Sequence, residues 1–249
     1  MMMTHNKIFL FLALNAILIS CKNKQDIVPL SNELLTMEQL YMVQRTNTIE
    51  EGMNNPDSVI KLTLYYQELD NIPYEIIYFK NLQSLGLSWN DIQTIPDFVS
   101  DIKYLQSIHL SSNKFNVIPK ELIQIKNLQY LLMNDNGINE IPSYIEDIHH
   151  LKTLEVSGNN IDKLPKELFN LEKLEVLVVN ENPLTEIPKT ICKLENLRVL
   201  DIRRTPVAEL PDCLFKNKNL RVLRVKGSKI TVSQVRDWKA LRPDLNIEF

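Results

Sequence analysis

Hydrophobic residues recur along this chain at a fixed interval of 23 residues. From residue 59 onward an apolar residue begins each unit, and two more follow it three and five residues later. In chain order the three sets are Val59, Leu82, Leu105, Leu128, Leu151, Leu174, Leu197 and Leu220; Leu62, Leu85, Ile108, Leu131, Leu154, Leu177, Leu200 and Leu223; Leu64, Leu87, Leu110, Met133, Val156, Val179, Ile202 and Val225. One such unit is too small to bury its own apolar face. The unbroken register therefore predicts eight repeats, over residues 59–230, that stack into a solenoid.

The second and third apolar positions of each repeat flank one residue of variable type, as in Leu154-Glu155-Val156. This alternation is the periodicity of a β-strand, with two side chains pointing inward and one outward. Eight such strands, about 4.8 Å apart, would form a parallel sheet whose open face is roughly 34 Å long. That open face would carry the variable residues.

Two polar columns accompany the apolar ones. Asparagine occupies five successive repeats, and its amide suits hydrogen bonding to a turning backbone; the column is Asn90, Asn113, Asn136, Asn159 and Asn182. Proline, which has a fixed φ and no N–H, suits the turn that leaves the strand side; its column is Pro73, Pro96, Pro119, Pro142, Pro165, Pro188 and Pro211. Apolar pairs three residues apart follow each proline, as at Leu168 and Leu171, and predict short helical or 3₁₀ segments facing the same core.

The stretch Leu151-Lys-Thr-Leu154-Glu-Val156-Ser-Gly-Asn159-Asn-Ile161-Asp-Lys-Leu164-Pro165 resembles the leucine-rich-repeat family. It is similar to the 23-residue class that is also seen in Scribble-type proteins. The resemblance covers residues 59–249 and implies an α/β fold, with a curved parallel sheet on the concave side and short helical segments on the convex side. It says almost nothing about a ligand.

Both ends of the repeat array should be capped, because a solenoid end exposes its core. Residues 31–58 predict a helical N-terminal cap covering the first strand, with Leu34, Leu35, Leu40, Val43, Ile49 and Met53 as its apolar residues. At the other end, residues 231–249, Thr231 and Gln234 form a capping-box pattern. A helix should follow with Val235, Trp238 and Leu241 on one face, and residues 246–249 should add a closing strand.

Residues 1–20 have the features of a secretory signal. Lys7 precedes an almost unbroken apolar run over residues 8–19, which is short for a membrane span. The sequence Leu18-Ile19-Ser20-Cys21 then resembles the lipobox of bacterial lipoproteins. That resemblance implies cleavage before Cys21, acylation of Cys21, a short tether over residues 21–30 and a place in the bacterial cell envelope, at the outer membrane or cell surface. An ordinary signal peptide, or an uncleaved anchor, is the alternative.

Composition excludes several function classes. A formal net charge of −3 argues against nucleic acid as a partner. The sequence contains no Gly-rich phosphate loop and no nucleophile elbow. In the outward column that contains His109, the next carboxylate is Glu155, two strands away. We therefore expect no catalysis, cofactor or metal, and a monomer.

Cys192 and Cys213 lie two register positions apart in adjacent repeats, beyond the roughly 7 Å Cα limit for a bridge, so we expect two free thiols.

The outward strand positions are the predicted working surface, in three zones. The first is aromatic, with Tyr65, Tyr66, Trp89, His109 and Tyr130; the second acidic, with Asp135, Glu155, Glu181 and Asp201; the third basic, with Arg203, Arg204, Arg224 and Lys226. Exposed aromatic residues are typical interface anchors, although singly they can also just cover apolar surface. The charges can likewise pair across strands, Asp201 with Arg224 and Glu181 with Arg204. We predict a surface that binds a protein or peptide; a structural scaffold of an envelope assembly and a glycan-binding protein are the alternatives.

Overall fold

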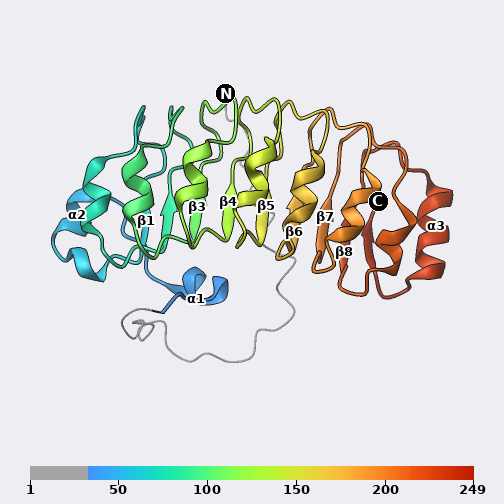
Figure 1. Ribbon diagram of the computed structural model, residues 1–249, viewed down its shortest axis with the longest axis horizontal. Coiled ribbons are helices and arrows are strands. Elements are labelled where there is room, and N and C mark those ends of the chain that lie inside the picture. The colour runs from blue at the N-terminus through green and yellow to red at the C-terminus, as the bar shows by residue number, and fades with distance from the viewer. Residues whose placement is uncertain (1–32) are drawn as a thin grey trace, which may run out of the picture.

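The computed structural model describes residues 33–249, which form a curved stack of repeats with one parallel sheet, running from β1 at the left to α3 at the right of Figure 1. Within this range the sheet has nine strands in the order of the chain. They are β1 (Lys61–Thr63), β2 (Ser84–Gly86), β3 (Ser107–His109), β4 (Tyr130–Leu132), β5 (Thr153–Glu155), β6 (Val176–Val178), β7 (Val199–Asp201), β8 (Val222–Arg224) and β9 (Asn246–Glu248). Each residue of β1 pairs with the residue 23 positions later in β2, and the same offset continues to β8. The predicted repeat and sheet are confirmed.

Seven 3₁₀ helices form the convex side, one for each repeated proline. They are η3 (Tyr74–Tyr78), η4 (Asp97–Asp101), η5 (Lys120–Gln124), η6 (Ser143–Asp147), η7 (Lys166–Asn170), η8 (Lys189–Lys193) and η9 (Asp212–Lys216). The proline directly precedes each helix with an extended backbone, as Pro165 does with φ −69° and ψ 150°. The proline column therefore starts the convex segment, as its residue type indicates.

The asparagine column holds the turn after each strand. The Asn90 amide donates to the carbonyls of Leu64 (2.8 Å) and Leu87 (2.9 Å), while its Oδ1 accepts from the backbone N–H groups of Gln67 and Leu69. Later members of the column repeat this pattern from one repeat to the next. Its architectural role is confirmed, since each amide joins two neighbouring repeats through backbone groups that would otherwise be buried without partners.

The N-terminal cap does not lie over the first strand as one helical unit, because its two helices occupy different places. Helix α2 (Ile49–Met53) and Thr46 lie at the edge of β1, where Thr46 accepts from the Thr63 N–H and donates to the Lys61 carbonyl. Helix α1 (Met37–Met42) instead packs Leu40 against Ile60 at the side of the sheet (Figure 1). Of the residues expected to cover the core, Leu35 and Leu40 are buried, whereas Leu34 and Met53 are exposed.

Two buried glutamines explain where α1 lies. Gln83 and Gln106 directly precede β2 and β3 and are 3% and 1% exposed. The Gln83 side chain accepts from the Leu35 N–H and donates to the Glu33 carbonyl, and Gln106 donates to the Leu35 carbonyl. Residues 33–35 are thereby bound along the side of the sheet where the strands begin, because their backbone groups find amide partners there.

The C-terminal cap follows the prediction except at one residue. Helix α3 (Val232–Leu241) has the expected capping box, since Gln234 N–H donates to Thr231 and the Gln234 side chain bonds back to the Thr231 N–H. Strand β9 closes the sheet against β8. Trp238 is buried and stacks on Phe215, but Leu241 is 70% exposed and does not share the buried face.

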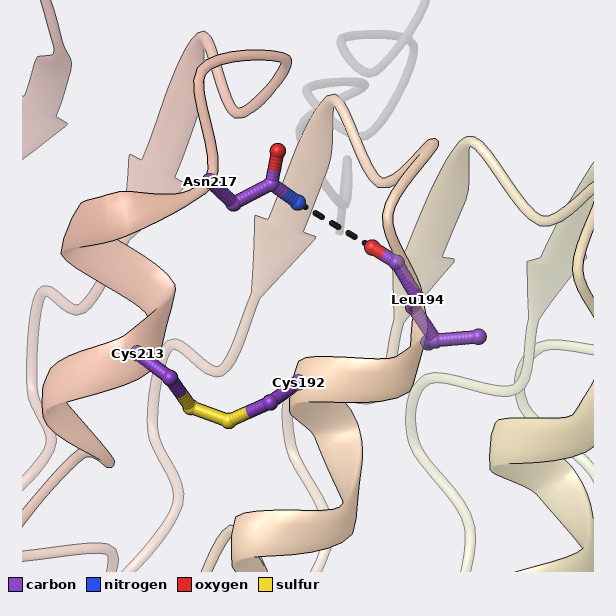
Figure 2. Close-up of a disulfide and its surroundings, with 4 residues drawn as sticks. All are labelled: Cys192, Leu194, Cys213 and Asn217. Atoms are coloured by element: carbon purple, nitrogen blue, oxygen red, sulfur yellow. Dashed lines mark hydrogen bonds between the residues drawn. A yellow bond between two sulfur atoms is a disulfide. The ribbon is translucent and has the colours of Figure 1, made fainter.

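The expectation of two free thiols is wrong, because Cys192 and Cys213 form a disulfide with their Cα atoms 5.8 Å apart (Figure 2). With three residues per turn, the residues before and after an inward residue of a 3₁₀ helix point to opposite sides. Cys192 follows inward Ile191 in η8 and Cys213 precedes inward Leu214 in η9, so the two side chains face each other across adjacent repeats. The two-residue offset amounts to only about 4 Å along such a helix.

Candidate functional site

The predicted site residues lie in four rows that cross the strands on the concave face, the fourth in the turn that follows the other three. The central row is Thr63, Gly86, His109, Leu132, Glu155, Val178, Asp201 and Arg224, and the register pairs each with the next. Tyr130 lies in the row that begins each strand, beside Ser107. The third row follows the strands and contains Tyr65 and Arg203.

Tyr65, Tyr66, Trp89 and His109 form what we call the aromatic cluster. The rings of Tyr66 and Trp89 stack with centroids 4.8 Å apart at 9°, and Tyr65 meets Trp89 edge-on at 5.6 Å. The Tyr65 ring lies over Gly86, where an added Cβ would come within 2.7 Å of it. Gly86 thus leaves the space through which Tyr65 of the first repeat reaches His109 of the third.

His109 completes this cluster as a neutral side chain. Its Nδ1 lies 3.3 Å from the Tyr65 hydroxyl and its Nε2 lies 3.0 Å from the Ser107 hydroxyl. Burial and the nearby Lys61 ammonium lower the pKa of His109 to about 4. Both ring nitrogens lie within hydrogen-bonding distance of hydroxyl groups, so His109 links Tyr65 of the first repeat to Ser107 of the third.

Tyr66 and Trp89 occupy an unusual backbone conformation. Both have positive φ, 57° and 58°, in the turn that follows the strand. We call the equivalent positions the left-handed row: Tyr66, Trp89, Ser112, Asp135, Gly158, Glu181, Arg204 and Gly227. A residue with a Cβ is disfavoured there by about 1–2 kcal/mol, and the conformation belongs to the turn of the repeat, because all eight residues of the row share it. Large exposed aromatics in such a row, 69% and 44% exposed, are more consistent with binding than with covering the core.

Arg45 and Lys61 border the aromatic cluster and were not anticipated from the sequence. Lys61 starts β1, donates to the Leu40 carbonyl at 3.1 Å and lies 5.8 Å from the centre of the Tyr41 ring. Burial and the Arg45 guanidinium lower the pKa of Lys61. The first-position row of the strands could have indicated Lys61, but Arg45 comes from the cap and is placed only by the fold.

The basic zone is largely neutralised by acidic neighbours. Asp201 is fully buried and accepts from the Arg203 guanidinium at 2.6–3.0 Å, with Arg224 at 3.8 Å. Arg224 also donates to Glu248 at 2.9 Å. The pairing of Asp201 with Arg224 across strands is therefore confirmed. Because the acid is wholly desolvated, this group fixes the last repeats more than it offers free charge.

The remaining predicted residues are spread along the rows. Glu181 and Arg204 form the expected ion pair at 2.9 Å, in the left-handed row. Asp135 lies in the same row, with its carboxylate over Gly158. Tyr130 is half-buried, and burial together with the Glu175 carboxylate raises its pKa. Cys21, the signal segment 1–20, the tether over residues 21–30 and the first two residues of the predicted N-terminal cap lie outside the described residues.

Within residues 33–249, no three His, Cys, Asp or Glu side chains come close enough to hold a metal ion. In the same range, no helix combines the length and apolar character needed to cross a membrane.

Two family models match the central repeats, one described as a leucine-rich repeat region over residues 116–184 and one as a leucine rich repeat over residues 80–138. No curated protein matches the chain. A leucine-rich-repeat protein of Leptospira interrogans is 26% identical in sequence, with a TM-score of 0.65, over 82% of this chain and 58% of that chain. This chain therefore spans little more than half the length of that relative.

Two further solved structures share the architecture. An internalin from Listeria monocytogenes is 20% identical with a TM-score of 0.66, over 83% of this chain and 58% of that chain, and shows the fold alone. The ectodomain of the plant membrane receptor kinase GASSHO1/SCHENGEN3 from Arabidopsis thaliana, solved in complex with Casparian strip integrity factor 2, is 28% identical with a TM-score of 0.58, over 78% of this chain and 24% of that chain. Together the fold and the family matches support a leucine-rich-repeat protein, a class that typically binds other proteins and is generally non-enzymatic.

Proposed function

We propose that this chain is a membrane-anchored lipoprotein of the 23-residue, Scribble-type class that binds a protein or peptide through its concave face. The observation that carries the proposal is the aromatic cluster. Tyr66 and Trp89 stack on each other, are exposed, and occupy backbone positions where glycine is favoured. Such rigid aromatic surface is what interface anchors provide, and it lies where several repeats can contact one extended ligand.

Support for an extracytoplasmic place comes from two separate features. Cys21 ends a lipobox-like sequence, and Cys192–Cys213 is a disulfide on the convex side. Disulfides persist in oxidising compartments and are rare in the cytosol, so the pair is consistent with export. We therefore place the protein in the cell envelope, acylated at Cys21, as a monomer that needs no cofactor or metal.

Photocrosslinking in the native cell tests the binding role. A photoreactive residue at Ser112, inside the left-handed row, should capture a species that the same residue at Lys166 on the convex η7 does not capture. Trp89→Ala should lower the yield at Ser112 strongly, since truncating an anchor often weakens binding about thirtyfold. Capture only from Lys166, or capture at Ser112 that ignores Trp89→Ala, would favour a structural scaffold. A captured glycan would replace the peptide proposal.

Anchoring is tested separately. Cys21→Ala should leave an unprocessed precursor or release the protein from membranes, because stable attachment requires more than one acyl chain, each buried CH₂ contributing about 0.8 kcal/mol. Normal maturation with unchanged membrane binding would remove the lipoprotein part of the proposal and leave the concave site untouched.

A further inference from the structure

Glu155 has an environment unlike those of the other concave acids. It ends β5, and its register neighbours are Leu132 in β4 and Val178 in β6, which are 8% and 1% exposed. Its Oε2 accepts from the Asn134 amide at 3.1 Å. Within residues 33–249 no hydrogen bond to Oε1 is formed, and no fully buried side-chain oxygen lacks a partner, so Oε1 is not fully enclosed by the protein.

The charge of Glu155 is also not neutralised by a cation in contact. Asp201 has Arg203 at 2.6 Å, and Glu181 has Arg204 at 2.9 Å, whereas no ion pair in the described range includes Glu155. Burial raises the pKa of Glu155, only partly offset by the hydrogen bond from Asn134. A half-buried carboxylate between apolar side chains disfavours folding unless a cation compensates it, and groups of this kind are found at binding sites.

We infer that Glu155 binds the basic side chain of a lysine or arginine in a peptide ligand, an inference that rests on the proposed function. One carboxylate cannot enclose a metal ion, which needs several oxygen ligands. A lysine or arginine suits the position better, because its methylene stem can lie on Leu132 and Val178 while its charged end reaches Oε1.

The fold also sets the spacing between this basic residue and the aromatic cluster. Glu155 lies three strands from Gly86, about 14 Å across the sheet, and Trp89 belongs to the turn that follows Gly86 in the same repeat. The two sites are therefore at least about 14 Å apart, which an extended peptide covers in about five residues. The expected ligand carries an aromatic or aliphatic residue for Trp89 and a basic residue about five positions away.

A displayed library of random dodecapeptides, selected on the full-length chain, tests this specificity. The variant is Glu155→Gln, which keeps the shape and can still accept from Asn134. Its matched control is Glu167→Gln, because Glu167 is paired with Lys166 and lies on the convex η7. Peptides selected on the wild type should share the spaced apolar and basic residues. A selected peptide should lose at least about tenfold in affinity for Glu155→Gln and less than about threefold for Glu167→Gln.

The outcomes separate the two proposals. If the selected peptides lack a basic residue, or bind Glu155→Gln as tightly as the wild type, while Trp89→Ala still abolishes binding, the assignment of Glu155 fails and the concave binding site stands. If no peptide is enriched, or if enriched peptides bind Trp89→Ala unchanged, the proposed function itself fails.

Discussion

Removing the disulfide between η8 and η9 should measurably destabilise the last repeats. The perturbation is the double variant Cys192→Ser, Cys213→Ser, and separately the reduced wild type. The bridge closes a loop with a sequence separation of 21 residues. On the loop-entropy model such a crosslink lowers the free energy of the folded state relative to the unfolded chain by about 3 kcal/mol. Both cysteines are half-buried, so serine removes little packing in comparison.

Urea unfolding followed by circular dichroism gives the free energy of unfolding of the oxidised, reduced and double-serine proteins. We expect the reduced wild type and the double variant to agree and to lie about 3 kcal/mol below the oxidised protein. Repeat arrays are stabilised mainly by neighbouring repeats, so hydrogen exchange should show the loss concentrated over η8, β7 and η9. Two thiols alkylated in the folded, unreduced protein, or equal stability of all three forms, would refute the reasoning and restore the expectation of free thiols.

Three further perturbations test the concave face. Gly86→Ala should displace the Tyr65 ring, weaken the near-ultraviolet circular dichroism signal and lower the free energy of unfolding by about 1 kcal/mol or more. In the control Gly137→Ala the added Cβ meets only a carbonyl oxygen at 3.5 Å, so neither the signal nor the stability should fall. Equal effects of the two variants would contradict the packing of Tyr65 over Gly86. Ser112→Gly should not lower the free energy of unfolding and should raise it by up to about 1 kcal/mol, because it relieves a positive φ; a clear loss in thermal unfolding would disprove this. Burial lowers the pKa of His109 to about 4 in the folded protein, against its ordinary value of 6.5 in the unfolded chain, so the free energy of unfolding should fall as the pH drops from 6.5 to 4. His109→Gln should flatten that dependence in urea unfolding measured across this pH range. An unchanged dependence would contradict the burial of His109.

The sequence alone determined the repeat, the sheet and most of the core. In a solenoid each repeat contacts only the repeats next to it, and the 23-residue period says which residues are equivalent. The packing of Leu85 beside Leu62 therefore follows from the register alone. The capping box at Thr231 was readable for the same reason, because its partner Gln234 is three residues away.

Only the tertiary structure decided features that depend on direction or on unrelated segments. The residues of the left-handed row could be read from the repeat, but their positive φ could not, because the chain turns after three strand residues and changes where Trp89 points. The place of α1 depends on Gln83 and Gln106, which are about 50 and 70 residues from their Leu35 partner. Whether Cys192 meets a partner depends on which side of a 3₁₀ helix each thiol occupies, and a register count measures separation along the chain but not the direction in which a side chain points.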